Sequence, residues 1–309
     1  MPLTRKRTFI LLLFLIVVWG VNWPLSKHAL EFCPPLLFGG IRLLIGGLVL
    51  LSIALPRWKK LQWTANWPYY FISAVLNIVL YYGLQTVGLQ YLPAGLFSAI
   101  VFLQPVLLGV FAWLWLGESM YGRKIAGLIL GFLGVAVIGA GGLTGTLSPL
   151  GIILGLGSAL SWALGTVYMK RIGSKVDSLW ITTMQVLIGG VVLLVAGTLN
   201  ETWSAITWNA NFIFDTLFIS VFVVAAGWMV FFTLVGSGEA SRVGSFTFLI
   251  PVVSISCSVI FMGEQLTANL ILGFIMIVGS IILVNSRKRK KTPDPSPRPP
   301  TQLGSSSNS

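Results

Sequence analysis

The chain has 309 residues, of which 56% are hydrophobic and 9% are charged, and its formal net charge is +12. With a mean hydropathy of +0.90, this composition excludes a soluble globular protein and indicates an integral membrane protein. The cations are dispersed among short segments and form no basic groove, so the positive charge does not indicate nucleic-acid binding.

Ten apolar runs follow one another along the chain, each near the ~20 residues that a helix needs to cross the hydrocarbon core. Pro, Gly and charged residues separate them. The predicted spans are 8–27, 35–55, 67–86, 93–116, 122–140, 149–169, 178–199, 211–234, 240–262 and 267–285. The first run continues past Trp19 without a small-residue cleavage site, so we expect a permanent span rather than a signal peptide.

The second half of the chain repeats the first. WGVNWPLSK at 19–27 returns as WALGTVYMK at 162–170, and LLIGGLVLL at 43–51 returns at the same spacing as VLIGGVVLL at 186–194. Each copy, 8–140 and 149–285, holds five predicted spans, and an odd number of spans places the second copy upside down. The predicted fold class is therefore all-α integral membrane, with about ten transmembrane helices as two inverted five-helix repeats.

Lys and Arg fall almost entirely on one side of this arrangement. On that side lie Arg5, Lys6, Arg7, Arg57, Lys59, Lys60, Arg123, Lys124, Lys170, Arg171, Lys175, Arg242 and the cluster at 287–291. Because short cytoplasmic loops are enriched in these residues, we expect a multi-pass protein of the cell membrane with both termini in the cytoplasm. Residues 1–7 form the N-terminal end, and 286–309 form a basic tail that is too polar to fold alone and is predicted to be disordered.

Several short motifs, in this order and duplicated, resemble the drug/metabolite transporter superfamily, EamA family. They are W-G-x-N-W at 19–23, Arg42 in the second span, Pro105 and Pro251 in the fourth and ninth spans, and G-E at 117–118 and 263–264. The resemblance covers residues 8 to 285. It implies a ten-helix carrier with a central cavity, often an exporter of amino acids or other small metabolites, and it does not name the substrate.

The two prolines indicate where such a cavity lies. Pro105 and Pro251 fall about halfway along their spans, where each removes a backbone donor and frees the carbonyl four residues earlier, at Val101 and Thr247. A packing kink explains either one alone, but matched positions in both copies favour a hinge or cavity wall near the midplane. Gln104 is polar at the same depth and has an apolar counterpart in the other repeat, so it is a ligand candidate.

Polar and aromatic side chains mark a substrate-binding region in the middle of the spans. The candidates are Trp19, Asn22, Trp23, Asn77, Tyr81, Gln85, Gln104, Trp162 and Trp228. Trp19 and Trp23 lie deeper in the span than an interfacial belt requires. Asn77, Tyr81 and Gln85 share one helical face and either line a cavity or hydrogen-bond to a neighbouring helix. Such a lining suits small amphipathic or aromatic metabolites.

Three charged residues within or beside the spans carry open alternatives. Arg42 either holds a substrate carboxylate or is structural, snorkelling outward or bonding to carbonyls and a helix end; its neutral repeat counterpart, Gln185, favours the structural role. Glu118 and Glu264 close the fourth and ninth spans and either cap the next helix or latch a gate, and we favour capping. No Asp or Glu lies mid-span, so proton antiport through a buried carboxylate is not expected.

Catalysis is the competing class. A membrane-embedded lipid-modifying enzyme needs a nucleophile, a base or a metal cluster, and the sequence offers one histidine, His28, and no pair of acids at a suitable spacing. We expect no catalytic residue, cofactor or metal. An exporter of lipophilic drugs or small solutes is a further alternative. The expected partners are a small-molecule substrate and the lipid bilayer, and Gly127, Gly131 and Gly134 form a small-residue face that fits either a homodimer or packing within the chain.

Overall fold

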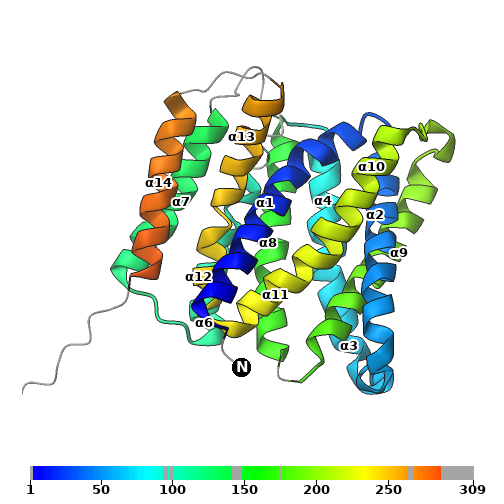
Figure 1. The fold of residues 1–309 in the computed structure, drawn as a ribbon, viewed down its shortest axis with the longest axis horizontal. Helices are drawn as coiled ribbons and strands as arrows, with labels where there is room; N and C mark the ends of the chain where they lie inside the picture. The colour runs from blue at the N-terminus through cyan, green and yellow to red at the C-terminus, as the bar shows by residue number, and fades with distance from the viewer. Residues whose placement is uncertain are drawn as a thin grey trace, which may run out of the picture.

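The computed structural model describes residues 3–92, 97, 100–140, 148–173, 175–262 and 268–286. Across these residues the chain is helical and contains no strand. The helices run roughly along one axis and form a bundle (Figure 1). The N-terminus and the end of the last helix lie at one end of this bundle, the terminal end, and we call the opposite end the distal end. Glu264 and the tail from residue 287 lie outside the described residues.

The first five spans occupy the N-terminal half of the chain. They consist of α1 (Arg5–Ala29), α2 (Pro35–Ala54) with the 3₁₀ turn η1 (Leu55–Lys60), a third span made of α3 (Trp63–Ala74), η2 (Val75–Leu80) and α4 (Tyr81–Gly88), the described part of the fourth span in α6 (Gln104–Leu116), and α7 (Gly122–Ala140). The predicted limits of these spans agree with the observed ones to within about one helical turn wherever the residues are described.

The second five spans follow the same plan. They consist of α8 (Pro149–Ile172), α9 (Ser178–Asn200) followed by the turn η3 (Trp203–Ala205), an eighth span made of α10 (Ala210–Phe218), η4 (Ile219–Gly227) and α11 (Trp228–Ser237), a ninth made of α12 (Ala240–Phe246) and α13 (Leu249–Met262), and α14 (Ala268–Asn285). In the described part of the chain, six continuous helical stretches are long and apolar enough to cross a membrane, and shorter apolar helices lie in the fourth, ninth and tenth spans. The predicted ten-span architecture is confirmed.

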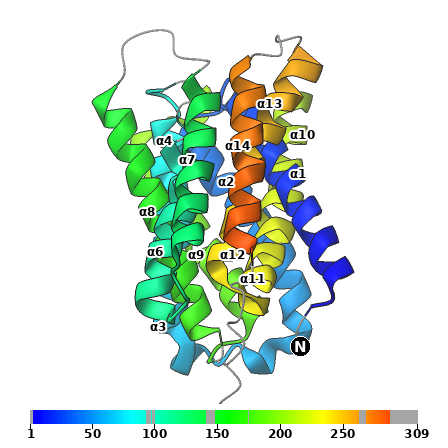
Figure 2. The same ribbon diagram turned by 90° about the vertical axis from the view of Figure 1, so that its left-hand side faces the viewer.

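The two halves are inverted. The counterparts α1 and α8 run in opposite directions along the bundle, α1 away from the terminal end and α8 towards it (Figures 1 and 2). Equivalent helices also pack against each other, α2 on α9 and α7 on α14. A Cβ atom on Gly40 would lie 2.6 Å from the Cα of Leu194, so a glycine is needed where α2 and α9 cross.

The glycine face of α7 is used inside the chain. Cβ atoms on Gly127, Gly131 and Gly134 would all lie within 3.0 Å of atoms from α14, and the one on Gly131 also within 2.5 Å of Phe248. Of the two alternatives for this face, packing within the chain is the one that the structure displays. A homodimer therefore requires a different surface.

Four spans depart from regular α-helix at matching places in the two repeats. The third and eighth contain the π-helical segments η2 and η4, which carry extra residues per turn and offset the backbone carbonyls. The fourth and ninth break at residues 102–103 and 247–248, so Pro105 and Pro251 stand in the first turn of a new helix instead of inside a continuous one. The carbonyl of Thr247, expected to be free, accepts the Ile250 N–H at 3.0 Å.

Candidate functional site

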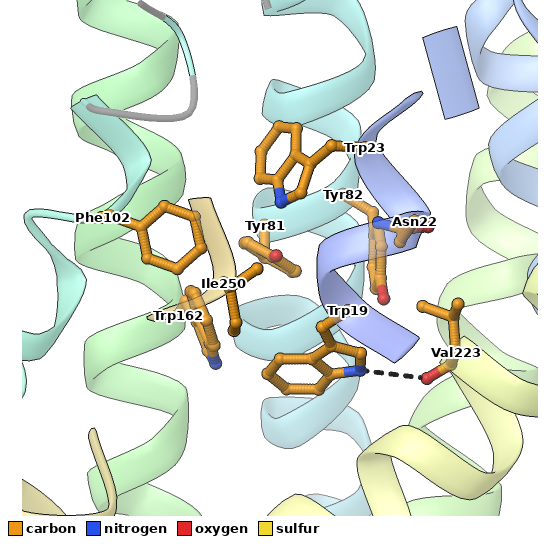
Figure 3. A pocket seen from close by; sticks show the side chains of 9 residues that line it. All are labelled: Trp19, Asn22, Trp23, Tyr81, Tyr82, Phe102, Trp162, Val223 and Ile250. Carbon is orange, nitrogen blue, oxygen red and sulfur yellow. Dashed lines mark hydrogen bonds between the residues drawn. The ribbon is translucent and has the colours of Figure 1, made fainter. Parts of the chain in front are cut away.

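A cluster of mostly aromatic side chains lies between helices of the two halves (Figure 3). We call it the aromatic chamber, and it is lined by Trp19, Asn22, Trp23, Tyr81, Tyr82, Phe102, Trp162, Val223 and Ile250. α1, α4 and the break in the fourth span supply residues from the first half, and α8, η4 and α13 supply them from the second. The cavity between these side chains is only about 10 Å³, close to the least that holds one water molecule.

The aromatic rings of the chamber contact one another across the boundary between the halves. The ring centre of Trp19 lies 5.5 Å from that of its repeat counterpart Trp162 and 5.6 Å from that of Trp228, both edge to face. The ring centre of Tyr81 lies 5.1 Å from that of Trp162. Edge-to-face pairs contribute about 0.5–1.5 kcal/mol each beyond burial. The rings therefore hold the halves together in this closed arrangement and at the same time provide a wall suited to a flat molecule.

The π-helical segments place their offset carbonyls where side chains of the other half reach them. The Trp19 Nε1–H donates to the Val223 carbonyl in η4 at 3.3 Å (Figure 3), and the Ser161 hydroxyl donates to the Leu76 carbonyl in η2 at 2.6 Å. Each half thus satisfies backbone groups of the other. Trp162 differs from Trp19, because its buried Nε1 has no hydrogen-bond partner among the described residues.

Five of the nine predicted substrate-binding residues line the chamber: Trp19, Asn22, Trp23, Tyr81 and Trp162. Trp228 adjoins it, since its Nε1–H donates to the Tyr82 hydroxyl at 3.0 Å.

The remaining three predicted residues, Asn77, Gln85 and Gln104, are buried but do not line the chamber. Asn77 donates to the Gln185 amide oxygen on α9 at 3.1 Å. Of the two alternatives for this residue, lining a cavity or bonding to a neighbouring helix, the structure displays the second. The amide of Gln104 has no partner among the residues described. These polar groups therefore lie between helices outside the chamber.

Sequence reasoning missed Tyr82, Phe102, Val223 and Ile250. Tyr81 and Tyr82 directly follow the π-helical segment η2, which shifts the register between α3 and α4, and both line the chamber. Phe102 and Ile250 lie within FLQPV at 102–106 and its repeat FLIPV at 248–252, and this repetition was the available signal for them.

Arg42 is almost fully buried, with 1% of its surface exposed, so the expectation that it snorkels outward is wrong. Its Nη1 donates to the Ser26 hydroxyl at 3.0 Å, and its guanidinium carbon lies 4.7 Å and 4.9 Å from the ring centres of Phe38 and Tyr82. Its Nε and Nη2 have no partner among the described residues, so the expected bonds to carbonyls are not formed there.

At the terminal end, Glu118 joins the two halves. Its carboxylate accepts the backbone N–H groups of Ala240 and Ser241 at 2.6 and 3.3 Å and the Ser241 hydroxyl, which places it on the N-terminus of α12. Lys124 and Lys170 lie 3.4 and 3.3 Å from it. The expected cap is present but on a helix of the other repeat, not on α7, the next helix in the chain.

The charge of Glu118 is well supported. Burial raises the pKa of this carboxyl, but the Ser241 hydrogen bond, the charge of Lys170, the Ala240 N–H and the charge of Lys124 together outweigh it and hold the pKa below the ordinary value. The carboxylate therefore stays ionised at neutral pH, when its hydrogen bonds are strongest.

At the distal end, two further contacts join the halves, and sequence reasoning missed both. The Glu201 carboxylate accepts the N–H groups of Leu36 and Leu37 at 2.9 and 2.8 Å, capping α2 from the end of α9. His28 Nδ1 lies 2.6 Å from the Asp215 carboxylate. Both ends of the bundle are thus tied across the boundary on which the aromatic chamber lies.

Known proteins resemble the chain over nearly its whole length. The EamA-like transporter family matches residues 6–140 and 149–286. The uncharacterized transporter YvbV of Bacillus subtilis is 63% identical over 93% of this chain and 94% of its own length. A probable amino-acid metabolite efflux pump of Escherichia coli is 28% identical over 90% of this chain and 94% of its own. A solved crystal structure with 19% identity superposes with a TM-score of 0.78, covering 91% of this chain and 97% of that one, so the fold is shared.

Proposed function

The chain belongs to the EamA-like transporter family, and we propose that it exports small metabolites, such as amino acids with aromatic or amphipathic side chains, by alternating access around the aromatic chamber. One observation carries this proposal: the chamber lies where two inverted repeats meet, and both repeats line it. Inverted-repeat carriers bind their substrates at such a boundary and move one half against the other around it.

The contacts at the two ends fit this cycle. Opening the terminal end requires Glu118 to leave the N-terminus of α12, and opening the distal end requires Glu201 to leave the N-terminus of α2. Each set joins one half to the other, so breaking one set while the other persists opens the chamber to one side only. Rocking of the halves about the chamber is therefore gated by acids that cap helices of the opposite half.

The closed chamber also supports a cycle with distinct states. Its volume of about 10 Å³ is far below that of a site holding a small organic molecule, which is about 300 Å³ or more. Substrate entry requires the rings to separate. We place the described arrangement between the inward-open and outward-open states, with the termini cytoplasmic because the cationic loops lie at the terminal end.

An exporter of lipophilic small solutes is the second candidate, and the aromatic lining favours it. The two candidates differ in the polar groups that they use. A lipophilic solute leaves the indole N–H of Trp162 without a partner, whereas a metabolite with an acceptor group satisfies it. Substitution of this indole by a ring without the N–H therefore separates them.

The test compares small molecules that accumulate in the medium of cells expressing the wild type, Trp162→Phe or Trp67→Phe. Trp67 is 53% exposed and serves as the matched control. We expect one or more amino acids or related metabolites to be enriched by the wild type and by Trp67→Phe, and to be enriched less by Trp162→Phe. Enrichment that survives Trp162→Phe contradicts the hydrogen bond assigned to this indole and favours the lipophilic-solute candidate, and no enrichment by the wild type contradicts export.

A further inference from the structure

Arg42 is a buried cation, and no acidic side chain in the described part of the chain pairs with it. It lies in α2, away from the helix ends, with 1% of its surface exposed. None of the ion pairs among the described residues includes it. A guanidinium taken out of water requires compensating contacts, and a buried charge without a counter-ion is strongly unfavourable.

The contacts that Arg42 does make leave one edge of its guanidinium unused. Nη1 donates to the Ser26 hydroxyl, and the ring faces of Phe38 and Tyr82 lie against the group. Nε and Nη2, which are buried and without partners among the described residues, lie on the same edge of the planar group and point their N–H bonds in parallel. That edge matches the two oxygens of a carboxylate.

The unused edge belongs to a group connected to the aromatic chamber. Tyr82, which packs on Arg42, lines the chamber. Ser26, which accepts from Arg42, donates in turn to the amide oxygen of Asn22 at 3.1 Å, and Asn22 lines the chamber as well. A single side chain, Tyr82, therefore separates the Arg42 guanidinium from the chamber, which the proposed function assigns to the substrate.

The repeat-related position carries no second cation. The position equivalent to Arg42 is Gln185, a neutral amide that accepts from Asn77 and whose Nε2 has no partner in the described part of the chain. A single guanidinium edge accommodates a single carboxylate. The repeat-related position offers a neutral hydrogen-bond donor instead.

From this geometry we propose that Arg42 binds the carboxylate of the transported molecule through Nε and Nη2, while the rest of that molecule lies among the rings of the chamber. The inference rests on the proposed function and deepens it, because it defines the substrate class as small molecules with one carboxylate and a flat or apolar body. Amines that lack a carboxylate are excluded, since they place a second cation beside Arg42.

The test measures the thermal unfolding midpoint of the purified full chain in detergent while it is titrated with three probes that share one ring. Phenylalanine carries a carboxylate and an amine, phenylacetate carries only the carboxylate, and phenethylamine carries only the amine. A ligand that binds the folded state raises the midpoint saturably, so each titration yields an apparent Kd. The proteins are the wild type, Arg42→Gln, Arg42→Lys and, as the matched control, Arg57→Gln at an exposed arginine in η1.

We expect both carboxylates to raise the midpoint of the wild type and of Arg57→Gln, and phenethylamine to have no effect. Arg42→Gln should weaken the binding of the carboxylates by about 30-fold or more, and Arg42→Lys by less, because it keeps the charge and loses the paired donors. Binding of phenethylamine as tight as that of the carboxylates overturns the inference, as does carboxylate binding that survives Arg42→Gln. So does the absence of any response to both carboxylates.

If Arg42→Gln does not fold, the discrimination among the three probes by the wild type decides the question alone. The export experiment tests the proposed function independently of these binding measurements. Export of a compound without a carboxylate leaves the carrier in place and overturns the role of Arg42. Absence of any export overturns the carrier, while selective binding of the carboxylates still identifies Arg42 as an anion site.

Discussion

Replacing Glu118 by glutamine should open the terminal end of the bundle. The substitution keeps the shape of the side chain but removes the charge that accepts from Ala240, Ser241 and two lysines. Hydrogen bonds to a charged group contribute about 1.5–3 kcal/mol each and neutral ones about 0.5–1.5 kcal/mol. Three bonds to the start of α12 thus lose about 3 kcal/mol together, and because they form only when the terminal end is closed, opening becomes about 100-fold more favourable.

The assay reads this opening from the chamber. A reporter cysteine is introduced as Ile250→Cys, a chamber position that is 1% exposed, after both native cysteines have been replaced by serine. Membrane vesicles of either orientation are treated with a membrane-impermeant thiol reagent. Glu118→Gln should raise the labelling rate from the terminal side by up to about 100-fold, because the rate follows the population of molecules whose terminal end is open. Glu31→Gln, at an exposed acid of the distal end, is the control and should leave that rate unchanged.

The same assay yields a pH prediction. Since the pKa of Glu118 in the folded protein is held below its ordinary value of 4.5, the stabilisation that its charge provides is complete above that value and is lost as the pH falls through the lowered pKa. Labelling of the wild type from the terminal side, divided at each pH by the labelling rate of a fully exposed cysteine to remove the titration of the thiol itself, should therefore be flat between about pH 5 and pH 8. A rate that Glu118→Gln leaves unchanged, or raises equally from both sides, refutes the role assigned to this carboxylate.

Three further predictions concern packing and the distal end. Gly40→Ala should lower the thermal unfolding midpoint by the equivalent of about 1–3 kcal/mol, because the added Cβ overlaps the backbone of α9. Gly122→Ala is the control and should leave the midpoint unchanged, because a Cβ there meets no atom within 4 Å. Equal effects of the two substitutions would contradict the close packing at Gly40. Burial, reinforced by the charge of a nearby carboxylate, raises the pKa of the Cys33 thiol to about 12, so alkylation of native protein at neutral pH should be slow; rapid modification in the closed state would argue against this burial. His28→Gln should raise chamber labelling from the distal side only, because it weakens the 2.6 Å contact with Asp215, and an unchanged distal rate would show that this pair does not gate.

The spans and their inversion could be predicted because they depend on properties that act along the sequence. Bilayer thickness sets the length of each apolar run, and the repeat of WGVNWPLSK as WALGTVYMK fixes the correspondence between halves. Trp19 and Trp162 emerged as chamber residues for the same reason, since both lie deep in their spans at equivalent positions. These predictions required no knowledge of which helix packs on which.

The remaining parts of the site depend on contacts between the halves, which no local pattern encodes. Glu118 looks like a cap for the helix that follows it, yet the N-terminus that it caps belongs to a helix more than 100 residues away in the chain. The π-helical segment η2 shifts the register between α3 and α4, so the face on which Tyr82 lies does not follow from a regular helical period, and no single-residue preference announces such a segment. The depth of Arg42 along its own helix suggests that it can snorkel, whereas it is buried with the rings of Phe38 and Tyr82 packed against its guanidinium.

The indole N–H groups of Trp19 and Trp162 differ in their hydrogen bonding, and this difference makes the two sides of the chamber unequal. With two identical walls, a small molecule would have two equivalent poses related by the pseudo-two-fold axis. One indole N–H already donates to the Val223 carbonyl, while the other has no partner among the described residues. One additional hydrogen bond, about 0.5–1.5 kcal/mol, favours one pose over the pose related to it by the axis by about 2- to 10-fold. The difference between the two halves thus gives a pseudo-symmetric chamber one preferred orientation for a bound molecule.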